Sequence, residues 1–299
     1  MNKVNIIGYS KIWLALSAGI LALSVLSIAV FGLNFGIDFT GGSLLEVKGV
    51  TASVEEVRGA VAATGHEATV QQSDTGTYFV RLSPITEDEH QSVLTAIKAL
   101  SPNAEELKFD SVGPTIGQEL KQSSVTALIL LLVLIGVYIA WAFRKVSYPV
   151  TSWKYGAVTM ISALHDVIIP IGAFAVLGKV FGYQIDTAFV AALLTILGYS
   201  INDTIVVLDR TRENLFRHRY HDQSFDEVVN TSVIETLGRS LNTTFSTIIP
   251  LVAIFFLGGE STRPFVLALI IGIMSGAYSS IFVASPLLVV MEKLGKGKK

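Results

Sequence analysis

Two aspartates lie inside stretches of sequence that are apolar enough to cross a membrane. Asp166 is near the middle of the apolar window 155–178, and Asp203 lies about sixteen residues into the window 187–208. An aspartate at the centre of a membrane helix costs about 2.5 to 3.5 kcal/mol on insertion scales, so it normally faces a partner or water and marks a functional path. Both carboxyls are therefore candidates for binding a transported proton.

A basic residue that can pair with Asp203 opens the next apolar window, 241–258. Arg239 lies near the level that Asp203 should occupy, and Thr243 follows one helical turn later on the same face. A carboxyl that gains and loses an arginine partner can take up and release a proton. We predict a proton relay of Asp203, Arg239 and Thr243, with Asp166 as a second-rank candidate.

Simpler interpretations of these residues stay open. An Asp203–Arg239 ion pair can hold two helices together without moving a proton, and Asp166 can hydrogen-bond a neighbouring helix. His165 and Asp166 lie about 100° apart on a helix, unlike metal ligands at i and i+4, so we expect no metal and no cofactor. The sequence has no nucleophile–base constellation and no glycine-rich phosphate loop, so we do not expect an enzyme.

Membrane helices must position these side chains. Of the 299 residues, 51% are hydrophobic and 15% are charged, which is more apolar surface than one water-soluble core needs. There is no cysteine, so no disulfide, and the net charge of -2 does not favour a nucleic-acid partner. A span needs about 20 mostly apolar residues. Six windows are candidates: 12–33, 123–143, 155–178, 187–208, 241–258 and 264–290.

The distribution of basic residues predicts the orientation, because cytoplasmic loops are enriched in Lys and Arg. One set of short segments holds fourteen of them and the opposite loops hold only Lys179 and Arg263, which places both termini and the loop 209–240 in the cytoplasm. The first window is longer than the apolar core of a signal peptide, so we interpret 1–33 as a cytoplasmic N-terminus and a retained first helix. The fourteen are Lys3, Lys11, Arg144, Lys145, Lys154, Arg210, Arg212, Arg217, Arg219, Arg239, Lys293, Lys296, Lys298 and Lys299.

The loop 209–240 combines a basic cluster with an amphipathic pattern. Ser224 and Glu227 form a capping box, and apolar residues follow at helical spacing, which predicts a helix lying on the cytoplasmic surface. The basic cluster is expected to contact anionic membrane lipid, with docking of a partner protein as the alternative. It consists of Arg210, Arg212, Arg217 and Arg219.

The hydrophilic block 34–121 has the pattern of a small α+β domain. Strands are predicted at 43–48, 67–72, 77–82 and 106–112, and helices begin at Ser53 and Thr86, each with a capping-box glutamate three residues later. The order β-α-β-β-α-β is ferredoxin-like. We therefore predict an extracytoplasmic ferredoxin-like domain at 34–121, with the remaining five membrane helices in 122–299.

Glycine-rich turns flank this block. Gly36, Gly41 and Gly42 surround Asp38 and permit the positive φ of a tight turn where the chain leaves the membrane. Gly113 and Pro114 form the matching return turn, because proline cannot extend the preceding strand. We interpret these residues as structural joints that can serve as hinges.

Four stretches are specific enough to compare with known families. They are GIDFTGGS (36–43), SVGPTIGQEL (111–120), ALHDVIIP (163–170) and GYSINDTIVVLDRTREN (198–214). In this order and spacing the chain resembles the SecF family of protein translocase subunits, within the SecD/SecF family and the resistance-nodulation-division (RND) superfamily. The last stretch carries most of the resemblance, and GIDFTGG alone would carry less.

The resemblance implies a multi-pass protein of the bacterial inner membrane that takes part in Sec-dependent protein export. Its implied partners are SecD, in a heterodimer, the SecYEG channel with accessory Sec subunits, and the unfolded preprotein. The family uses the proton motive force, and its relay residues match Asp203, Arg239 and Thr243 here, while the other essential aspartate belongs to SecD. Two alternatives are an RND-type small-molecule exporter subunit and a passive scaffold of the translocase.

Overall fold

The structure, a computed structural model, describes residues 4–73, 75–144, 150–216 and 223–296. Within these residues, six helices are long and apolar enough to cross a membrane, which confirms the predicted α-helical polytopic membrane protein. The chain divides into two compact units, a helical unit of Met1–Asn34 and Thr126–Lys299 and an α+β unit of Phe35–Val125.

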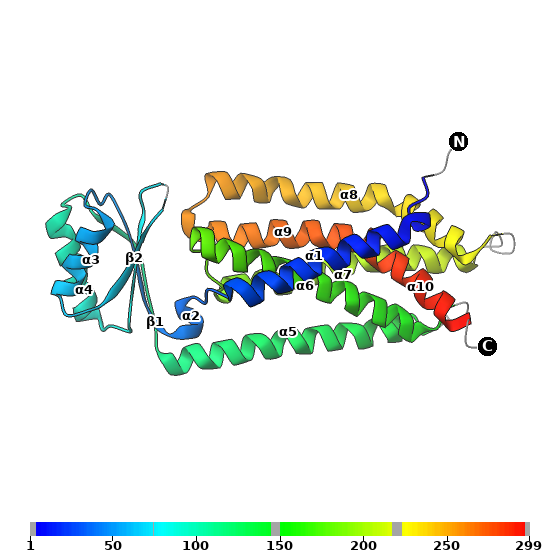
Figure 1. The fold of residues 1–299 in the computed structure, drawn as a ribbon, viewed down its shortest axis with the longest axis horizontal. Coiled ribbons are helices and arrows are strands. Elements are labelled where there is room, and N and C mark those ends of the chain that lie inside the picture. Colours follow the sequence, from blue (N-terminus) through cyan, green and yellow to red (C-terminus); the bar gives the residue numbers. More distant parts are fainter. Residues whose placement is uncertain (1–3, 74, 145–149, 217–222, 297–299) are drawn as a thin grey trace. The chain divides into compact units, whose positions relative to one another are not determined.

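The long helices of the helical unit lie side by side (Figure 1). The sixth span is irregular, because a π-helix interrupts it, and π-helical turns are rare and often occur at functional sites. The spans are α1 (Ser10–Phe31), α5 (Pro114–Ala142), α6 (Ser152–Phe181), α7 (Thr187–Phe216), α8 (Phe225–Leu257) and the sixth, composed of α9 (Arg263–Ser279), the π-helix η4 (Ser280–Ala284) and α10 (Ser285–Lys296). Short 3-10 turns, η1 (Ile7–Tyr9) and η3 (Glu260–Thr262), precede the first and last spans.

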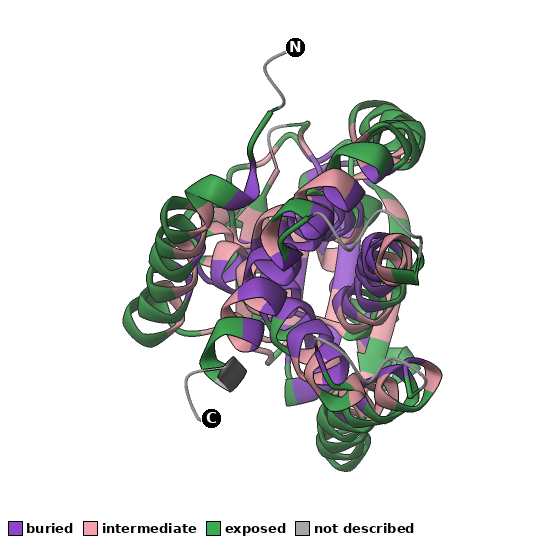
Figure 2. Ribbon diagram, turned by 90° about the vertical axis from the view of Figure 1, so that its right-hand side faces the viewer, coloured by how far each residue is buried: buried purple, intermediate pink, exposed green. Residues whose placement is uncertain are grey.

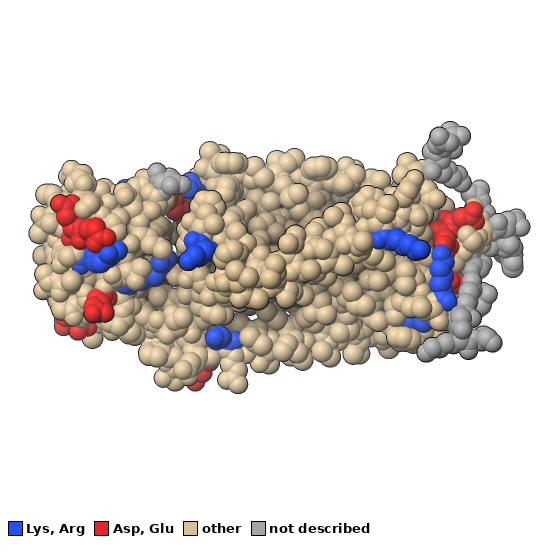
Figure 3. All heavy atoms as spheres, in the orientation of Figure 1, with Lys and Arg blue, Asp and Glu red and all other residues tan. Residues whose placement is uncertain are grey.

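The middle of the helical unit is formed by α6, α7 and α9. Half of the most apolar window of α6 and of α7 is buried (50% each), whereas only 11% is buried in α1, α5 and α8. Figure 2 shows the buried residues gathered toward the middle and the exposed ones on the outward sides of the outer helices. A broad band of the surface drawn in Figure 3 shows no charged side chain on the helical unit, as lipid contact requires.

Close approach of α1 to α6 depends on a missing side chain at Gly172. A Cβ atom at Gly172 would lie 2.5 Å from the Cα atom of Ser24 on α1. Real Cβ atoms do not approach backbone so closely, so the two helices would have to move apart if this glycine were replaced.

We therefore expect Gly172→Ala to lower the free energy of unfolding by about 1 to 3 kcal/mol, the usual cost of overpacking. The matched control is Gly19→Ala on α1, where a Cβ meets no atom within 4 Å. That control should be neutral or gain up to about 1 kcal/mol of helix propensity. Thermal unfolding of both variants in detergent measures the difference, and equal melting temperatures would contradict the prediction.

The predicted surface helix in the loop 209–240 is wrong. The capping box of Ser224 and Glu227 is confirmed, but the helix that it begins continues without a break to Leu257 as α8. Its apolar side is not free for a membrane surface, because Val229 and Val233 are fully buried in a cluster with residues of α7 and α10. The sequence pattern was amphipathic because this face packs against other helices.

The basic cluster of that loop is only partly described. Arg210 is paired with Glu213 (2.5 Å) and with Glu235 of α8 (2.6 Å), and Arg212 is paired with Asp209 (2.6 Å). Arg217 and Arg219 lie outside the described residues. In the described part, the guanidinium groups therefore neutralise carboxylates of α7 and α8, and lipid contact by this cluster stays a prediction.

The α+β unit confirms the predicted β-α-β-β-α-β order. Its strands are β1 (Gly42–Lys48), β2 (Ala68–Gln72), β3 (Tyr78–Leu82) and β4 (Glu105–Val112), and its helices are α3 (Val54–Ala63) and α4 (Glu87–Leu100). The sheet order is β2-β3-β1-β4 with all neighbours antiparallel, and Leu45 of β1 faces Val80 of β3 in the register. Residues of both helices and of the sheet bury one common core, which includes Leu45, Val57, Val80, Val93 and Ile97.

Both predicted capping boxes of this unit are present, at Ser53 with Glu56 and at Thr86 with Glu89. The backbone N–H of Ser53 donates to Glu56 and that of Thr86 donates to Glu89, each at 2.7 Å. These hydrogen bonds favour the charged carboxylate and lower the pKa of Glu56 and of Glu89 below the ordinary value of 4.5. Both helix starts are therefore stabilised by ionised glutamates.

The lowered pKa values of Glu56 and Glu89 make the stability of both helix starts depend on pH. Because the folded-state pKa lies below the unfolded one, the stabilisation is present above about pH 4.5 and is lost as the pH falls through the lowered pKa values. We expect the amides of α3 and α4 to lose protection against hydrogen exchange in that window, after correction for intrinsic exchange rates. The double variant Glu56→Gln and Glu89→Gln should reduce this pH dependence, of which the lowered pKa of Glu87 on α4 keeps a part. An unchanged dependence would contradict the assignment.

The glycine turns form a tight joint within this unit. Gly41 (φ 73°) and Gly42 (φ 135°) have the predicted positive φ and follow a short helix, α2 (Ile37–Thr40). Gly36 does not, since its φ is -73°, and this part of the prediction is wrong because Gly36 begins α2 in an extended conformation. A Cβ on Gly41 would lie 2.9 Å from the Cα atom of Pro114. The exit turn and the return turn that contains Gly113 thus contact each other, while their role as hinges stays a prediction.

Candidate functional site

Asp203 lies on α7, and its carboxylate joins three segments of the helical unit. Only 6% of the residue is exposed. Ser240 of α8 donates a hydrogen bond to Oδ1 at 2.5 Å, and Ser280 of η4 donates to Oδ2 at 2.5 Å. Hydroxyl donors are what a buried carboxylate needs when no cation is near. Any change in the charge of Asp203 therefore acts directly on α8 and on the π-helical turn.

The predicted Asp203–Arg239 ion pair is not formed. Arg239 is exposed, and none of the ion pairs among the described residues involves its guanidinium. The reason is helix geometry, because Arg239 and Ser240 are adjacent and point about 100° apart on α8, and packing turns Ser240 toward Asp203. Thr243 does lie on the same face as Arg239 and donates to the Arg239 carbonyl oxygen at 3.0 Å. The structure thus brings Asp203 together with a serine and leaves the other two relay residues on the outer side of α8.

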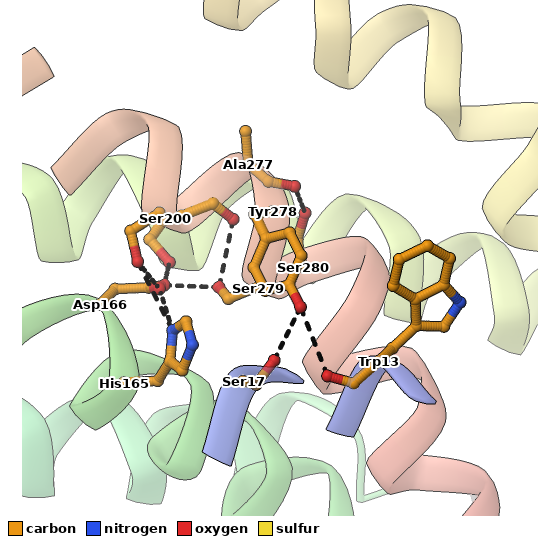
Figure 4. Close-up of polar contacts among 11 residues, drawn as sticks. Trp13, Ser17, His165, Asp166, Ser200, Ala277, Tyr278, Ser279 and Ser280 are labelled. Atoms are coloured by element: carbon orange, nitrogen blue, oxygen red, sulfur yellow. Dashed lines mark hydrogen bonds and ion pairs between the residues drawn. The ribbon is translucent and has the colours of Figure 1, made fainter. Parts of the chain in front are cut away.

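Asp166 of α6 is fully buried at the centre of a hydroxyl cluster. Ser275 donates to Oδ1 at 2.9 Å and Ser279 donates to Oδ2 at 2.6 Å, both from α9, and Ser200 of α7 also donates to Oδ2. Figure 4 shows the Ser200 and Ser279 hydroxyls converging on Asp166 from different helices. The alternative prediction that Asp166 hydrogen-bonds neighbouring helices is confirmed, and a proton-carrying role stays a prediction.

His165 lies beside this cluster. Its Nδ1 is 2.9 Å from Oδ1 of Asp166, although the two residues are adjacent, and its ring stacks near Tyr278 with 6.1 Å between the centroids. Tyr278 shares a hydrogen bond of 2.9 Å with Ser17 of α1 (Figure 4). Among the described residues, no group of three His, Asp or Glu side chains is arranged to hold a metal ion.

The serines are the site residues that the sequence analysis missed. Four of the five lie in apolar windows and Ser240 directly precedes one, and small hydroxyl residues in membrane helices commonly hydrogen-bond across helix interfaces. Ser275 and Ser279 are four residues apart and lie on one face of α9, which is a signal that was present in the sequence. The full set is Ser200, Ser240, Ser275, Ser279 and Ser280.

A polar strip runs along the outward side of α8 where its apolar window 241–258 begins. It consists of four exposed residues at i, i+3, i+4 and i+7, and Asn202 of the adjoining α7 is exposed as well. Lipid tails offer no hydrogen bonds, so a guanidinium and an amide at this position require water or another protein. The α8 strip is Arg239, Asn242, Thr243 and Ser246.

Most of the chain is similar in sequence to known proteins. Residues 92–294 match the family model described as "Protein export membrane protein SecD/SecF, C-terminal", and residues 26–51 match "SecD/SecF GG Motif", which contains Gly41 and Gly42. A protein translocase subunit SecF of Thermobaculum terrenum is 44% identical over 303 residues, which cover 97% of this chain and 94% of that protein.

Longer relatives contain this chain as one part. A protein translocase subunit SecDF of Thermus thermophilus is 36% identical over 99% of this chain and 40% of its own length. The crystal structure of SecDF, described as a translocon-associated membrane protein from the same organism, superimposes with a TM-score of 0.84 at 34% identity and covers 97% of this chain. The chain spans 39% of that solved structure.

Proposed function

The chain belongs to the SecD/SecF family of protein-export membrane proteins, and we propose that it is the SecF-type subunit that couples a proton gradient to polypeptide export. Membership of this family supports a role of the chain in protein translocation. The proton-coupling part rests on the residues of this chain, and above all on Asp203.

One observation carries the proposal, the buried carboxylate of Asp203 held by serines of two other segments. Among the described residues, no ion pair holds Asp203, and its carboxylate accepts hydrogen bonds from the hydroxyls of Ser240 and Ser280. When a proton binds, the carboxyl becomes a donor at one oxygen, so Ser240 and Ser280 can no longer both donate as before. Protonation therefore changes the contacts that hold α8 and η4 to α7.

The polar strip on α8 supports a membrane-embedded protein partner. An acidic side chain of another protein would supply the counter-charge for Arg239, since an unpaired charge in lipid is costly. SecD is the partner we propose, because SecF-type and SecD-type names are joined in the single-chain SecDF relative. An acidic side chain of SecD would then pair with Arg239. The relay would be completed by movement of the Arg239 guanidinium between that acid and Asp203.

The orientation and the remaining partners are part of the same proposal. The excess of Lys and Arg in one set of loops supports cytoplasmic termini and a bacterial inner-membrane location. The α+β unit would then face outward and hold the unfolded preprotein as it leaves the SecYEG channel. We propose that the chain performs no covalent chemistry and that ATP hydrolysis belongs to another component.

The test is export in vesicles that contain the chain, its SecD-type partner and the SecYEG channel. With ATP supplied, a proton gradient should raise the yield of translocated preprotein, and an uncoupler should remove the increase. A passive scaffold would leave the yield independent of the gradient. A small-molecule exporter would change the drug tolerance of cells and leave secretion unaffected.

A further inference from the structure

A second buried carboxylate holds the segments on which the Asp203 site is built. Asp166 receives hydroxyl hydrogen bonds from Ser200 on α7 and from Ser279 on α9. Ser200 precedes Asp203 by three residues on the same helix, and Ser279 directly precedes Ser280, which is the Oδ2 donor of Asp203. The two carboxylates therefore act on the same two chain segments at neighbouring positions.

The Ser279–Ser280 step is the place where the sixth span changes its helix type. α9 ends at Ser279, and the π-helix η4 begins at Ser280. The extra residue of a π turn shifts the direction of the side chains that follow, and the Ser285 hydroxyl donates to the Ser280 carbonyl oxygen at 3.1 Å within this turn. The direction of the Ser280 side chain thus depends on where the π turn begins.

We infer that Asp166 is a positioning residue of the proton relay, which anchors Ser279 so that the π turn begins at Ser280 and aims the Ser280 hydroxyl at Asp203. This inference rests on the proposed function. Among the described residues, the hydrogen bonds of Asp166 and those of Asp203 come from different serines, and Asp166 acts on Asp203 through Ser200 on α7 and through the Ser279–Ser280 step. Its four polar neighbours come from three helices and fix the relative positions of α6, α7 and α9 at this level.

The elements that pack against this cluster carry further ionisable groups. They are Lys154, Tyr155 and Lys179 on α6, Asp209, Arg210, Arg212 and Glu213 on α7, Asp226, Glu227, Glu235 and Arg239 on α8, and Arg263 on α9. His165 and Tyr278 flank Asp166, and Asp203 and Tyr199 lie on α7. On α1 the only ionisable side chain is Lys11, close to its start, η4 has none, and Glu292 and the lysines of α10 lie beyond η4.

The experiment compares variants in the vesicle export assay as a function of pH. Ser279→Ala and Asp166→Asn should shift the pH profile of gradient-driven export by about one unit, a tenfold change in proton concentration, because the Ser280 hydroxyl is no longer held toward Asp203. Ser279→Thr restores a hydroxyl and should restore the profile. The matched control is Ser17→Ala, which removes the hydroxyl bond to Tyr278, next to Ser279, and should leave the profile in place.

Different results would overturn the positioning role of Asp166 and the proposed function. Asp203→Asn serves as the reference, and full gradient-driven export in that variant would overturn the proposed function itself. If Asp203→Asn is inactive while Ser279→Ala and Asp166→Asn keep the original pH profile, only the positioning role is overturned. Loss of export at every pH in Asp166→Asn, with normal co-purification of the partner and an unchanged melting temperature, would show that Asp166 carries the proton itself and would also overturn the positioning role.

Discussion

Replacing Asp203 with asparagine is expected to abolish the part of export that depends on the proton gradient, while the chain still folds and assembles. Asparagine has nearly the same volume, and its side-chain oxygen can still accept from Ser240 or Ser280. It cannot bind and release a proton. One charge crossing 100 mV releases about 2.3 kcal/mol, so the variant loses a bias of roughly 50-fold per proton moved.

The measurement is the rate of preprotein translocation in vesicles with and without a proton gradient. Asp186→Asn is the matched control, because it makes the same substitution near the start of the same helix, where Asp186 accepts a hydrogen bond from the Phe189 N–H at 2.7 Å. Asparagine is an equally good helix cap, so this variant should export normally. If gradient-driven export persisted in Asp203→Asn, the proton-relay proposal would be contradicted and the passive-scaffold interpretation would be favoured.

Replacing Arg239 with leucine should weaken assembly with the SecD-type partner as well as proton coupling. Leaving one member of a buried ion pair without its partner typically costs about 3 to 5 kcal/mol, which corresponds to roughly 100-fold or more in the dissociation constant. The structure leaves Arg239 exposed on the outward side of α8 and outside the ion pairs of the described chain, which is why the counter-charge must come from elsewhere. Export should therefore fall together with co-purification.

The control for this prediction is Arg212→Leu. Arg212 is paired with Asp209 three residues earlier on α7, and both side chains are partly exposed to solvent. Such pairs contribute about 0 to 1 kcal/mol, so subunit affinity should change by less than tenfold. A dissociation constant for Arg239→Leu that equals that of the unmodified chain would mean that Arg239 faces water or lipid headgroups and takes no part in the interface.

Local patterns in the sequence were sufficient to predict the helices and strands of the α+β unit. The capping boxes of Ser53 and Thr86 and the alternation in the strands gave the order of the α+β unit, because these patterns depend on residues within one turn or one hairpin. The same reasoning failed for the helix that begins at Ser224. Its amphipathic face has the same spacing whether it faces a membrane surface or other helices, and only the packing of Val229 and Val233 distinguishes the two.

Hydropathy and spacing along the chain were enough to predict a six-span membrane protein with an α+β insertion and two aspartates in apolar spans, because these patterns require no knowledge of neighbouring helices. Which side chains meet those aspartates depends on how the helices pack in the folded protein. Neighbouring residues on a helix point about 100° apart, so the choice between Arg239 and Ser240 depends on how α8 is rotated against α7. That rotation, like the π turn at Ser280, is set by packing between helices far apart in the sequence.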